Sequence, residues 1–404
     1  AKGASLAVVS NQKTSNKKIV VKDTLKFLTK ASSILRENLP SKIISITGSC
    51  GKTSLKELIG RSLNKISQTT YSPKSFNNKF GVPLSLFNLK KDDDFGIFEI
   101  GMNKKGEIDY LSKIIKPDIG VITNISYAHI KNFKNINQIA LAKSEIIKNI
   151  KAHGYLILNK DDKFYSFHKK LGLKRNLKIL SFSLKNKNAT TNLNSISKEK
   201  SKYKISININ KKKTYFYSNS FFENDLNNLL ATITIIAIFK DIQKIDKNIF
   251  YDHKVINGRG DIVHVKLLKK SFYLVDESYN SNPLSLKSAL KNFDMIKVDN
   301  AKKHLVLGDM LELGKYSKKL HIEMAKNINK TSLKNINVIG EHVKWTFNNL
   351  KKSKRGLVIK NKFQIINLIK NSLNNNDYLM IKGSNSTGLY SLVNQIKTGK
   401  INAL

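Results

Sequence analysis

Short apolar runs alternate with amphipathic stretches along most of the chain. The run at 43–47 (IISIT) is followed by a glycine turn and then by apolar residues at helical spacing: Leu55, Leu58, Ile59, Leu63 and Ile66. Such a change of period predicts a strand that leads into a helix. Further buried strands are predicted at 96–101, 118–125 and 154–159. Strands that alternate with helices indicate a mostly parallel, doubly wound α/β sheet.

In the rest of the chain, the pattern of apolar and polar residues changes twice. Residues 160–222 are rich in Lys, Ser and Asn, which predicts an antiparallel or irregular excursion, and an apolar helix is predicted over 226–240. Its longest apolar run is too short to cross a bilayer and indicates a buried helix. A second α/β unit is predicted to begin near 257–261 (NGRGD), with strands at 271–276, 303–308, 336–340 and 377–383.

The first 40 residues precede this pattern. They contain a strand candidate at 6–9 and a helix candidate at 23–37, before the linker NLPSK. The chain starts with Ala1, so we expect its N terminus to be incomplete, and no signal peptide is visible. Its length of 404 residues exceeds what one compact core holds, which predicts two or three domains.

Composition adds a large positive charge. The formal net charge is +43, which taken alone favours a nucleic-acid partner. The excess is mostly lysine spread over the whole chain, without aromatic residues interleaved with Arg, so dispersed solvated lysine is the preferred interpretation. The single cysteine, Cys50, excludes an internal disulfide and fits a reducing cytosol.

The stretch ITGSCGKTSLKE (46–57) carries the clearest chemistry. Its Gly-Lys-Thr follows a predicted strand and opens an amphipathic helix, although Gly48 lies closer to Gly51 than the common G-x-x-x-x-G-K-[ST] loop requires. Backbone N–H groups and the helix N terminus would bind phosphate there. Lys52 would neutralise phosphate oxygens, and the Thr53 hydroxyl would bind Mg²⁺.

Other polar residues follow predicted strands, at the sheet edge where ligands bind in open parallel sheets. Glu99 ends one strand and His129 follows the next, while Lys143 lies in a later helix. In the second unit, Arg259 could fork onto a phosphate and Asp276 ends a strand. Taken singly, each of these residues has an ordinary structural explanation.

The order of these motifs resembles the Mur ligase family, ATP-dependent amide ligases of cell-wall precursor synthesis, and within it the branch that adds D-alanyl-D-alanine. The resemblance runs from about 43 to 389 and is carried by ITGSCGKTSLKE, FNNKFGVPLSL, FEIGMNKKGEI, NISYAHI, ALAKSEI, NGRGD, DESYNSNPLSLKSAL, LGDMLELG and KGSNSTGL. DESYNSNP and LGDMLELG discriminate best between the branches.

The resemblance implies three domains and a cytoplasmic, monomeric enzyme without nucleic-acid partner or membrane insertion. Residues 1–40 would be the remnant of an N-terminal UDP-sugar-binding domain, 41–253 a P-loop-type ATP-binding domain with a mostly parallel central sheet, and 254–404 a Rossmann-like C-terminal domain. The implied substrates are UDP-MurNAc-tripeptide and D-alanyl-D-alanine, which an acyl phosphate intermediate would join.

The resemblance also implies residue roles. Catalysis would fall to Lys52, His129 and Lys143, with Lys143 carbamylated. Two Mg²⁺ ions would be held by Thr53, Glu99, His129 and Lys143. ATP would contact Thr47, Gly48, Ser49, Cys50, Gly51, Lys52, Thr53, Ser54, Asn224, Asn227, Arg259 and Asp276. The acceptor and dipeptide would contact Asn77, Asn78, Asn280 and Asn282.

Two positions depart from the family pattern. Asn385 stands where the family commonly has arginine, which leaves Lys382 and backbone N–H groups to bind an anion, and Cys50 replaces a more usual asparagine. The alternatives that stay open are another Mur-type amino-acid ligase, a nucleic-acid-stimulated P-loop ATPase and a catalytically impaired fragment.

Overall fold

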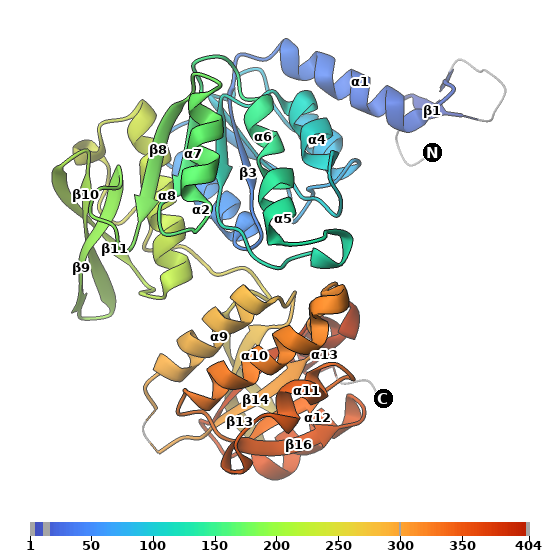
Figure 1. The fold of residues 1–404 in the computed structure, drawn as a ribbon, viewed down its shortest axis with the longest axis vertical. Coiled ribbons are helices and arrows are strands. Elements are labelled where there is room, and N and C mark those ends of the chain that lie inside the picture. Colours follow the sequence, from blue (N-terminus) through green and yellow to red (C-terminus); the bar gives the residue numbers. More distant parts are fainter. Residues whose placement is uncertain (1–4, 11–16, 299, 401–404) are drawn as a thin grey trace. The chain divides into compact units, whose positions relative to one another are not determined.

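The structure is a computed structural model that describes residues 5–10, 17–298 and 300–400. Contacts divide the chain into two compact units. Unit 1 comprises 1–124, 140–219 and 226–251, and unit 2 comprises 125–139, 220–225 and 252–404. Each unit combines a mostly parallel sheet with helices (Figure 1), which confirms the predicted α/β fold class.

A large sheet forms the centre of unit 1, in the order β11-β10-β9-β8-β7-β6-β3-β5-β4. Neighbouring strands from β4 to β9 run parallel, and β9, β10 and β11 run antiparallel. The strands are β3 (Lys42–Thr47), β4 (Thr69–Tyr71), β5 (Phe95–Glu99), β6 (Ile119–Ile122), β7 (Tyr155–Asn159), β8 (Lys178–Ser183), β9 (Thr191–Glu199), β10 (Lys202–Ile209) and β11 (Lys212–Ser218).

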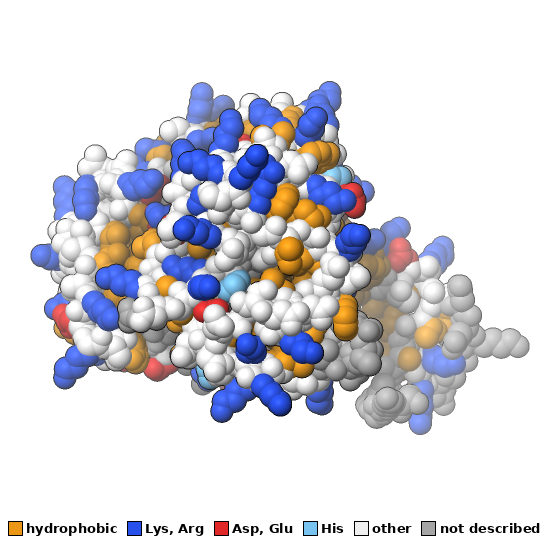
Figure 2. All heavy atoms as spheres, turned by 90° about the horizontal axis from the view of Figure 1, so that it is seen from below, with side chains coloured by type: hydrophobic (Ala, Val, Ile, Leu, Met, Phe, Trp, Pro, Cys, Tyr) orange, Lys and Arg blue, Asp and Glu red, His pale blue; other side chains and the backbone are white. Residues whose placement is uncertain are grey.

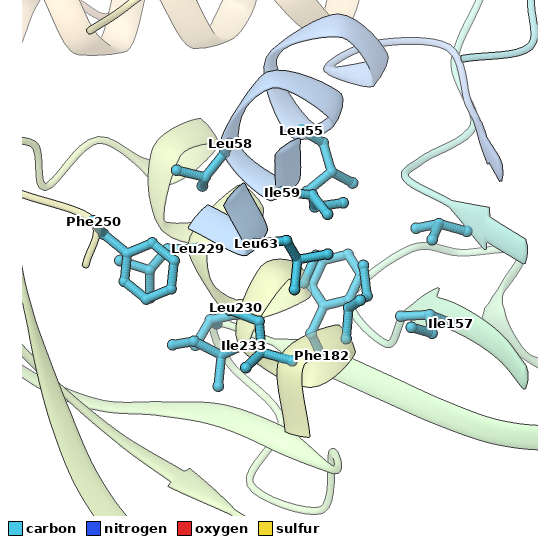
Figure 3. Packing of buried hydrophobic residues seen from close by; sticks show 14 of the residues in the cluster. Leu55, Leu58, Ile59, Leu63, Ile157, Phe182, Leu229, Leu230, Ile233 and Phe250 are labelled. Carbon is cyan, nitrogen blue, oxygen red and sulfur yellow. The ribbon is translucent and has the colours of Figure 1, made fainter. Parts of the chain in front are cut away.

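Helices connect the parallel strands of this sheet, and one further helix, α8, follows the antiparallel strand β11. They are α2 (Lys52–Asn64), α3 (Gly81–Leu86), α4 (Glu107–Ile115), α5 (Ile136–Lys143), α6 (Glu145–Lys148), α7 (Tyr165–Leu173) and α8 (Glu223–Phe239). The apolar face predicted for α2 is buried, and Figure 3 shows its Leu55, Leu58, Ile59 and Leu63 beside Leu229, Leu230 and Ile233 of α8. This packing fixes the start of α2 at the end of β3, where the phosphate loop lies.

The N-terminal segment agrees with its predicted elements. Helix α1 (Thr24–Glu37) begins at Asp23, whose carboxylate accepts hydrogen bonds from the backbone N–H groups of Leu25 and Lys26. Strands β1 (Ala7–Val9) and β2 (Lys18–Val20) pair in parallel, and Figure 1 shows β1 at the far end of α1 from the large sheet.

Unit 2 contains a second sheet in the order β12-β13-β17-β14-β15-β16, antiparallel between β12 and β13 and otherwise parallel. Its strands are β12 (Asp261–Leu267), β13 (Lys270–Glu277), β14 (Lys303–Gly308), β15 (Ile336–Ile339), β16 (Arg355–Ile359) and β17 (Tyr378–Lys382). Its helices are α9 (Pro283–Met295), α10 (Ser317–Asn329), α11 (Val343–Asn348), α12 (Phe363–Ser372) and α13 (Leu389–Thr398).

No helix in the described part of the chain combines the length and the apolar character that a bilayer span requires. The long helix α8 is instead buried along most of its length, with Leu230, Ile233 and Ile235 fully inaccessible to solvent. This confirms the interpretation of its apolar run as a core helix.

Candidate active site

The phosphate loop of unit 1 lies between the end of β3 and the start of α2. Gly48 has a φ of 149°, and a Cβ atom there would lie 1.9 Å from Thr123 Oγ1, so only glycine fits. Gly51 precedes α2 with a φ of 81°, a left-handed conformation that glycine adopts without strain. The loop therefore approaches the end of β6 as closely as the backbone allows.

Hydrogen bonds hold this loop against the segment that follows β6. Asn124 Oδ1 accepts from Cys50 N–H at 2.9 Å, and Thr123 Oγ1 donates to the Cys50 carbonyl at 2.7 Å. The Lys52 ammonium donates to the Gly48 carbonyl at 3.0 Å, so it lies over the loop. Asn124 begins the NISYAHI motif and Thr123 precedes it, but the sequence analysis assigned neither residue a role at the phosphate loop.

Thr53 and Glu99, both expected to bind metal, lie together at the carboxyl edge of the sheet. Thr53 Oγ1 donates to Glu99 Oε2 at 2.7 Å, and both side chains are buried. Asn77 donates its amide N–H to Glu99 Oε1 at 2.6 Å, and Ser75 Oγ lies 3.4 Å from Thr53 Oγ1. Hydroxyl and carboxylate oxygens at this spacing are a donor set that suits Mg²⁺.

Lys143 ends α5 and is only 1% exposed. Burial, followed by the nearby positive charge of Lys52, holds the pKa of Lys143 well below its usual range. Burial and the neighbouring charge therefore favour the neutral amine over the ammonium.

Lys56, one turn beyond the phosphate loop, is a buried lysine that the sequence analysis did not identify. Its ammonium donates to the carbonyl oxygens of Ser72 and Lys74, at 2.5 and 2.6 Å, and pairs with Glu57 at 2.9 Å. These contacts hold the segment that leads to Ser75 and Asn77.

The remaining amides of unit 1 have defined places. Asn78 Oδ1 accepts hydrogen bonds from the backbone N–H groups of Phe80 and Gly81, at the start of α3. Asn227 lies in the first turns of α8. The next residue, Asn228, has its Oδ1 3.7 Å from the position that a Cβ atom would take at Gly51. The amide of Asn228 is thus near the phosphate loop. Asn224, in unit 2, is exposed.

His129 belongs to unit 2, where its Nδ1 lies 2.5 Å from Glu312 Oε2. The hydrogen bond from His129 is the main cause that lowers the pKa of Glu312. His129 has a φ of 59° and Glu312 a φ of 62°, so each is in the left-handed region. The predicted role of His129 as a metal ligand stays a prediction.

In unit 2, Arg259 lies in the turn before β12, and Asp276 lies near the end of β13. The guanidinium carbon of Arg259 lies 4.4 Å from the centre of the Tyr279 ring. Asp276 is fully buried, and its Oδ1 accepts hydrogen bonds from the N–H and hydroxyl of Ser278. Lys397 donates to its Oδ2 at 2.5 Å. The carboxylate thus has structural partners.

The two asparagines expected near the dipeptide differ in their surroundings. Asn282 caps α9 in a reciprocal pair of hydrogen bonds with Ser285. Asn280 is exposed, and its carbonyl accepts a hydrogen bond from Lys382, which also pairs with Glu277. Lys382 is 1% exposed, so its charge is committed within the fold. Asn385 is exposed.

Two family models cover most of the chain. The Mur ligase middle domain matches residues 46–236, and the Mur ligase glutamate ligase domain matches residues 258–385. The phosphate loop, Glu99 and Lys143 lie in the first match, and Arg259, Asp276 and Asn280 lie in the second.

Curated relatives and solved structures point to one branch of these ligases. The UDP-N-acetylmuramoyl-tripeptide–D-alanyl-D-alanine ligase of Rickettsia prowazekii is 32% identical over 97% of this chain and 87% of its own length. The ligase of that name from Buchnera aphidicola is 32% identical over 94% of this chain and 81% of its own. The crystal structure of MurF from Acinetobacter baumannii has a TM-score of 0.84 at 25% identity, covering 97% of this chain and 84% of that one.

Proposed function

The chain belongs to the Mur ligase family, and within it to the UDP-N-acetylmuramoyl-tripeptide–D-alanyl-D-alanine ligases, and from this premise we infer that it joins D-alanyl-D-alanine to UDP-MurNAc-tripeptide in an ATP-dependent reaction. The observation that carries the inference is the phosphate loop of unit 1, with the Thr53–Glu99 pair beside Asn77.

The reaction forms an amide from a carboxylate, which is a poor electrophile. A carboxylate oxygen of the tripeptide attacks the γ-phosphorus of ATP, and ADP leaves. The amine of D-alanyl-D-alanine then attacks the acyl carbon, loses a proton, and expels phosphate. Because two anions must approach each other in the first step, positive charge around the phosphates is the main requirement.

The residues of the chain supply that charge. Backbone N–H groups of the phosphate loop and the N terminus of α2 would bind the phosphates, together with the Lys52 ammonium that lies over the loop. Arg259 would contact phosphate from the C-terminal domain. Asn224, Asn227 and Asp276 would lie near the nucleoside.

The donor set of unit 1 fits Mg²⁺. Thr53, Glu99 and a carbamylated Lys143, with His129 for a second ion, would hold metal, which would neutralise charge between the phosphate oxygens and the attacking carboxylate. An ammonium at Lys143 would repel Mg²⁺. The low pKa and burial of Lys143 support a neutral amine that reacts with CO₂ to form a carbamate and release a proton.

The remaining assignments follow from the same family. Residues 1–40 would be part of a UDP-sugar-binding domain, 41–253 the ATP-binding domain and 254–404 the C-terminal domain of a cytoplasmic monomer. Asn77, Asn78, Asn280 and Asn282 would line the substrate sites. Figure 2 shows Lys and Arg scattered over the face in view and not gathered in one stripe. This favours dispersed charge on that face rather than a nucleic-acid-binding surface.

The proposal is tested by measuring phosphate release from ATP with both substrates present, then with either one omitted. Phosphate release that requires the tripeptide, and amide product that also requires D-alanyl-D-alanine, are expected. Lys52→Ala should lower turnover by roughly 100-fold or more, as removal of comparable charge-stabilising donors does. ATP hydrolysis that nucleic acid stimulates, with no response to the tripeptide, would refute the assignment.

A further inference from the structure

Arg259 is held in a turn between two glycines. Gly258 has a φ of 81° and Gly260 a φ of 102°, so both flanking residues adopt backbone conformations that other residues rarely adopt. A Cβ atom at Gly258 would lie 2.7 Å from Tyr279 Cβ, which shows how closely the turn approaches the segment that follows β13. The direction of the Arg259 side chain therefore depends on what holds this turn.

Two aspartates hold the N–H groups of these glycines. Gly258 N–H donates to Asp261 Oδ1 at 2.8 Å, and Gly260 N–H donates to the Asp276 carbonyl at 2.8 Å. Asp261 and Asp276 face each other as directly paired residues of the antiparallel strands β12 and β13. Like charges directly opposite each other destabilise a strand pair, so this anchor needs a compensating cation.

Lys397 supplies that cation from α13, near the end of the chain. Its ammonium donates to Asp261 Oδ2 and to Asp276 Oδ2, each at 2.5 Å. Asp261 is 9% exposed and Asp276 is 0% exposed, so neither carboxylate is well solvated by water. Burial acts to lower the pKa of Lys397, but its hydrogen bonds to the two aspartates outweigh burial and raise that pKa.

We propose that Lys397 is a positioning residue of the ligase: by bridging Asp261 and Asp276 it fixes the turn from Gly258 to Gly260, and so orients the guanidinium of Arg259. The proposal rests on the proposed function, in which Arg259 contacts the phosphate of ATP. Without the ammonium, the facing carboxylates repel each other. Gly258 N–H then loses a fixed carboxylate acceptor, and the strand pairing that presents the Asp276 carbonyl to Gly260 N–H is loosened.

The test is a double-mutant cycle on kcat, because independent sites add and coupled sites do not. Lys397→Met should lower kcat of the full chain by about 10- to 100-fold, the range found when residues that orient a functional group are removed. In an Arg259→Ala background, Lys397→Met should lower kcat less than about twofold further. Lys344→Met, which removes an exposed ion pair with Glu341, is the matched control and should keep the parent kcat.

Each other outcome has a defined meaning. A full additional loss in the Arg259→Ala background would overturn the positioning role while the proposed function stands. Full kcat in Lys397→Met would do the same. Unchanged kcat in Arg259→Ala itself would overturn both the role of Arg259 and this inference.

Hydrogen exchange of the backbone amides gives a second readout that a general loss of stability would not mimic. In Lys397→Met, the amides of Gly258 and Gly260 should exchange at least about tenfold faster, while amides of β15 keep their parent rates. Equal acceleration in both places would identify Lys397 as a merely structural residue. Because exchange needs no catalysis, this measurement decides the question even where the variant has lost activity.

Discussion

Lys143 combines burial with a lowered pKa. Its side chain is 1% exposed, and burial together with the charge of Lys52 lowers the pKa of the amine, which favours its neutral form. A neutral amine can form a carbamate, and a carbamate is an anionic ligand for Mg²⁺.

Replacement of Lys143 by alanine should lower tripeptide-dependent phosphate release by at least roughly 100-fold, because the site loses an anionic ligand. Added short carboxylic acids such as acetate should recover part of the activity by occupying the vacated volume. The measurement is the rate of phosphate release against acid concentration. Recovery by acetate should be missing in Lys52→Ala, where the deleted group is a cation. Full activity of Lys143→Ala without any acid would disprove the carbamate.

At the scale of elements, the segment between β4 and α3 depends on one helix residue. Lys56 of α2 donates to the carbonyls of Ser72 and Lys74, and this segment carries Asn77, which contacts Glu99. Because a lysine in a helix is usually exposed, this contact was not predicted from the sequence. The fold buries Lys56 completely, so the contact links the phosphate-binding helix to the Glu99 site.

Lys56→Met should lower the free energy of unfolding by about 2–3 kcal/mol, because two buried carbonyls and Glu57 lose their charged partner. It should also lower kcat, since Asn77 is no longer held against Glu99. Urea unfolding and steady-state kinetics measure the two effects. Lys113→Met is the control: its ion pair with Asp109 has a lysine side chain 65% exposed, and a change under about 0.5 kcal/mol is expected.

The elements themselves were largely readable from the sequence. Strands β3, β5, β6 and β7, and helix α2, were predicted from apolar runs, because a parallel sheet covered on both faces requires such runs. The predicted antiparallel excursion is confirmed for β9, β10 and β11, but α7 and the parallel strand β8 were missed within it. Strands β12 and β16 were also missed; both are edge strands of the second sheet, where Ile262, Leu357 and Val358 are exposed and the buried pattern is incomplete.

The site was only partly predictable, for a physical reason. Motifs mark residues that contact a ligand, and Thr53 and Glu99, predicted from motifs, do lie 2.7 Å apart. Residues that hold those groups in place, such as Thr123, Lys56 and Lys397, make contacts between distant parts of the sequence. The local spacing of residues does not predict such contacts, because the partners meet only in the folded chain.

At the scale of the whole molecule, buried histidines occur in both units. His168 in unit 1 and His304 and His321 in unit 2 are at most 3% exposed. In each case burial lowers the pKa, although a hydrogen bond to Ala140, Asp377 or Ser317 respectively opposes the shift. The hydrogen bonds of His321 also fit a neutral ring. Its Nε2 accepts from Met310 N–H while its Nδ1 donates to the Ser317 carbonyl, and a protonated ring could not accept at Nε2.

A lowered folded-state pKa means that the unfolded chain binds protons more readily. The stability contribution is therefore complete above the unfolded pKa of about 6.5 and is lost as pH falls below it. Each such histidine steepens the loss by up to about 1.4 kcal/mol per pH unit. Urea unfolding at pH 7.5, 6.0 and 5.0 should show midpoints that fall most steeply below pH 6.5, before the carboxylates titrate.

The histidine origin of that loss can be separated from the general effect of charge. With a net charge of +43, added protons also increase repulsion across the molecule, but this effect weakens with salt, whereas burial of a neutral ring does not. His304→Gln should therefore flatten the pH dependence of unfolding in both low and high salt. His153→Asn is the control, because His153 is exposed and asparagine tolerates its φ of 58°. An equal pH dependence in the parent chain and His304→Gln would trace the acid sensitivity to repulsion instead.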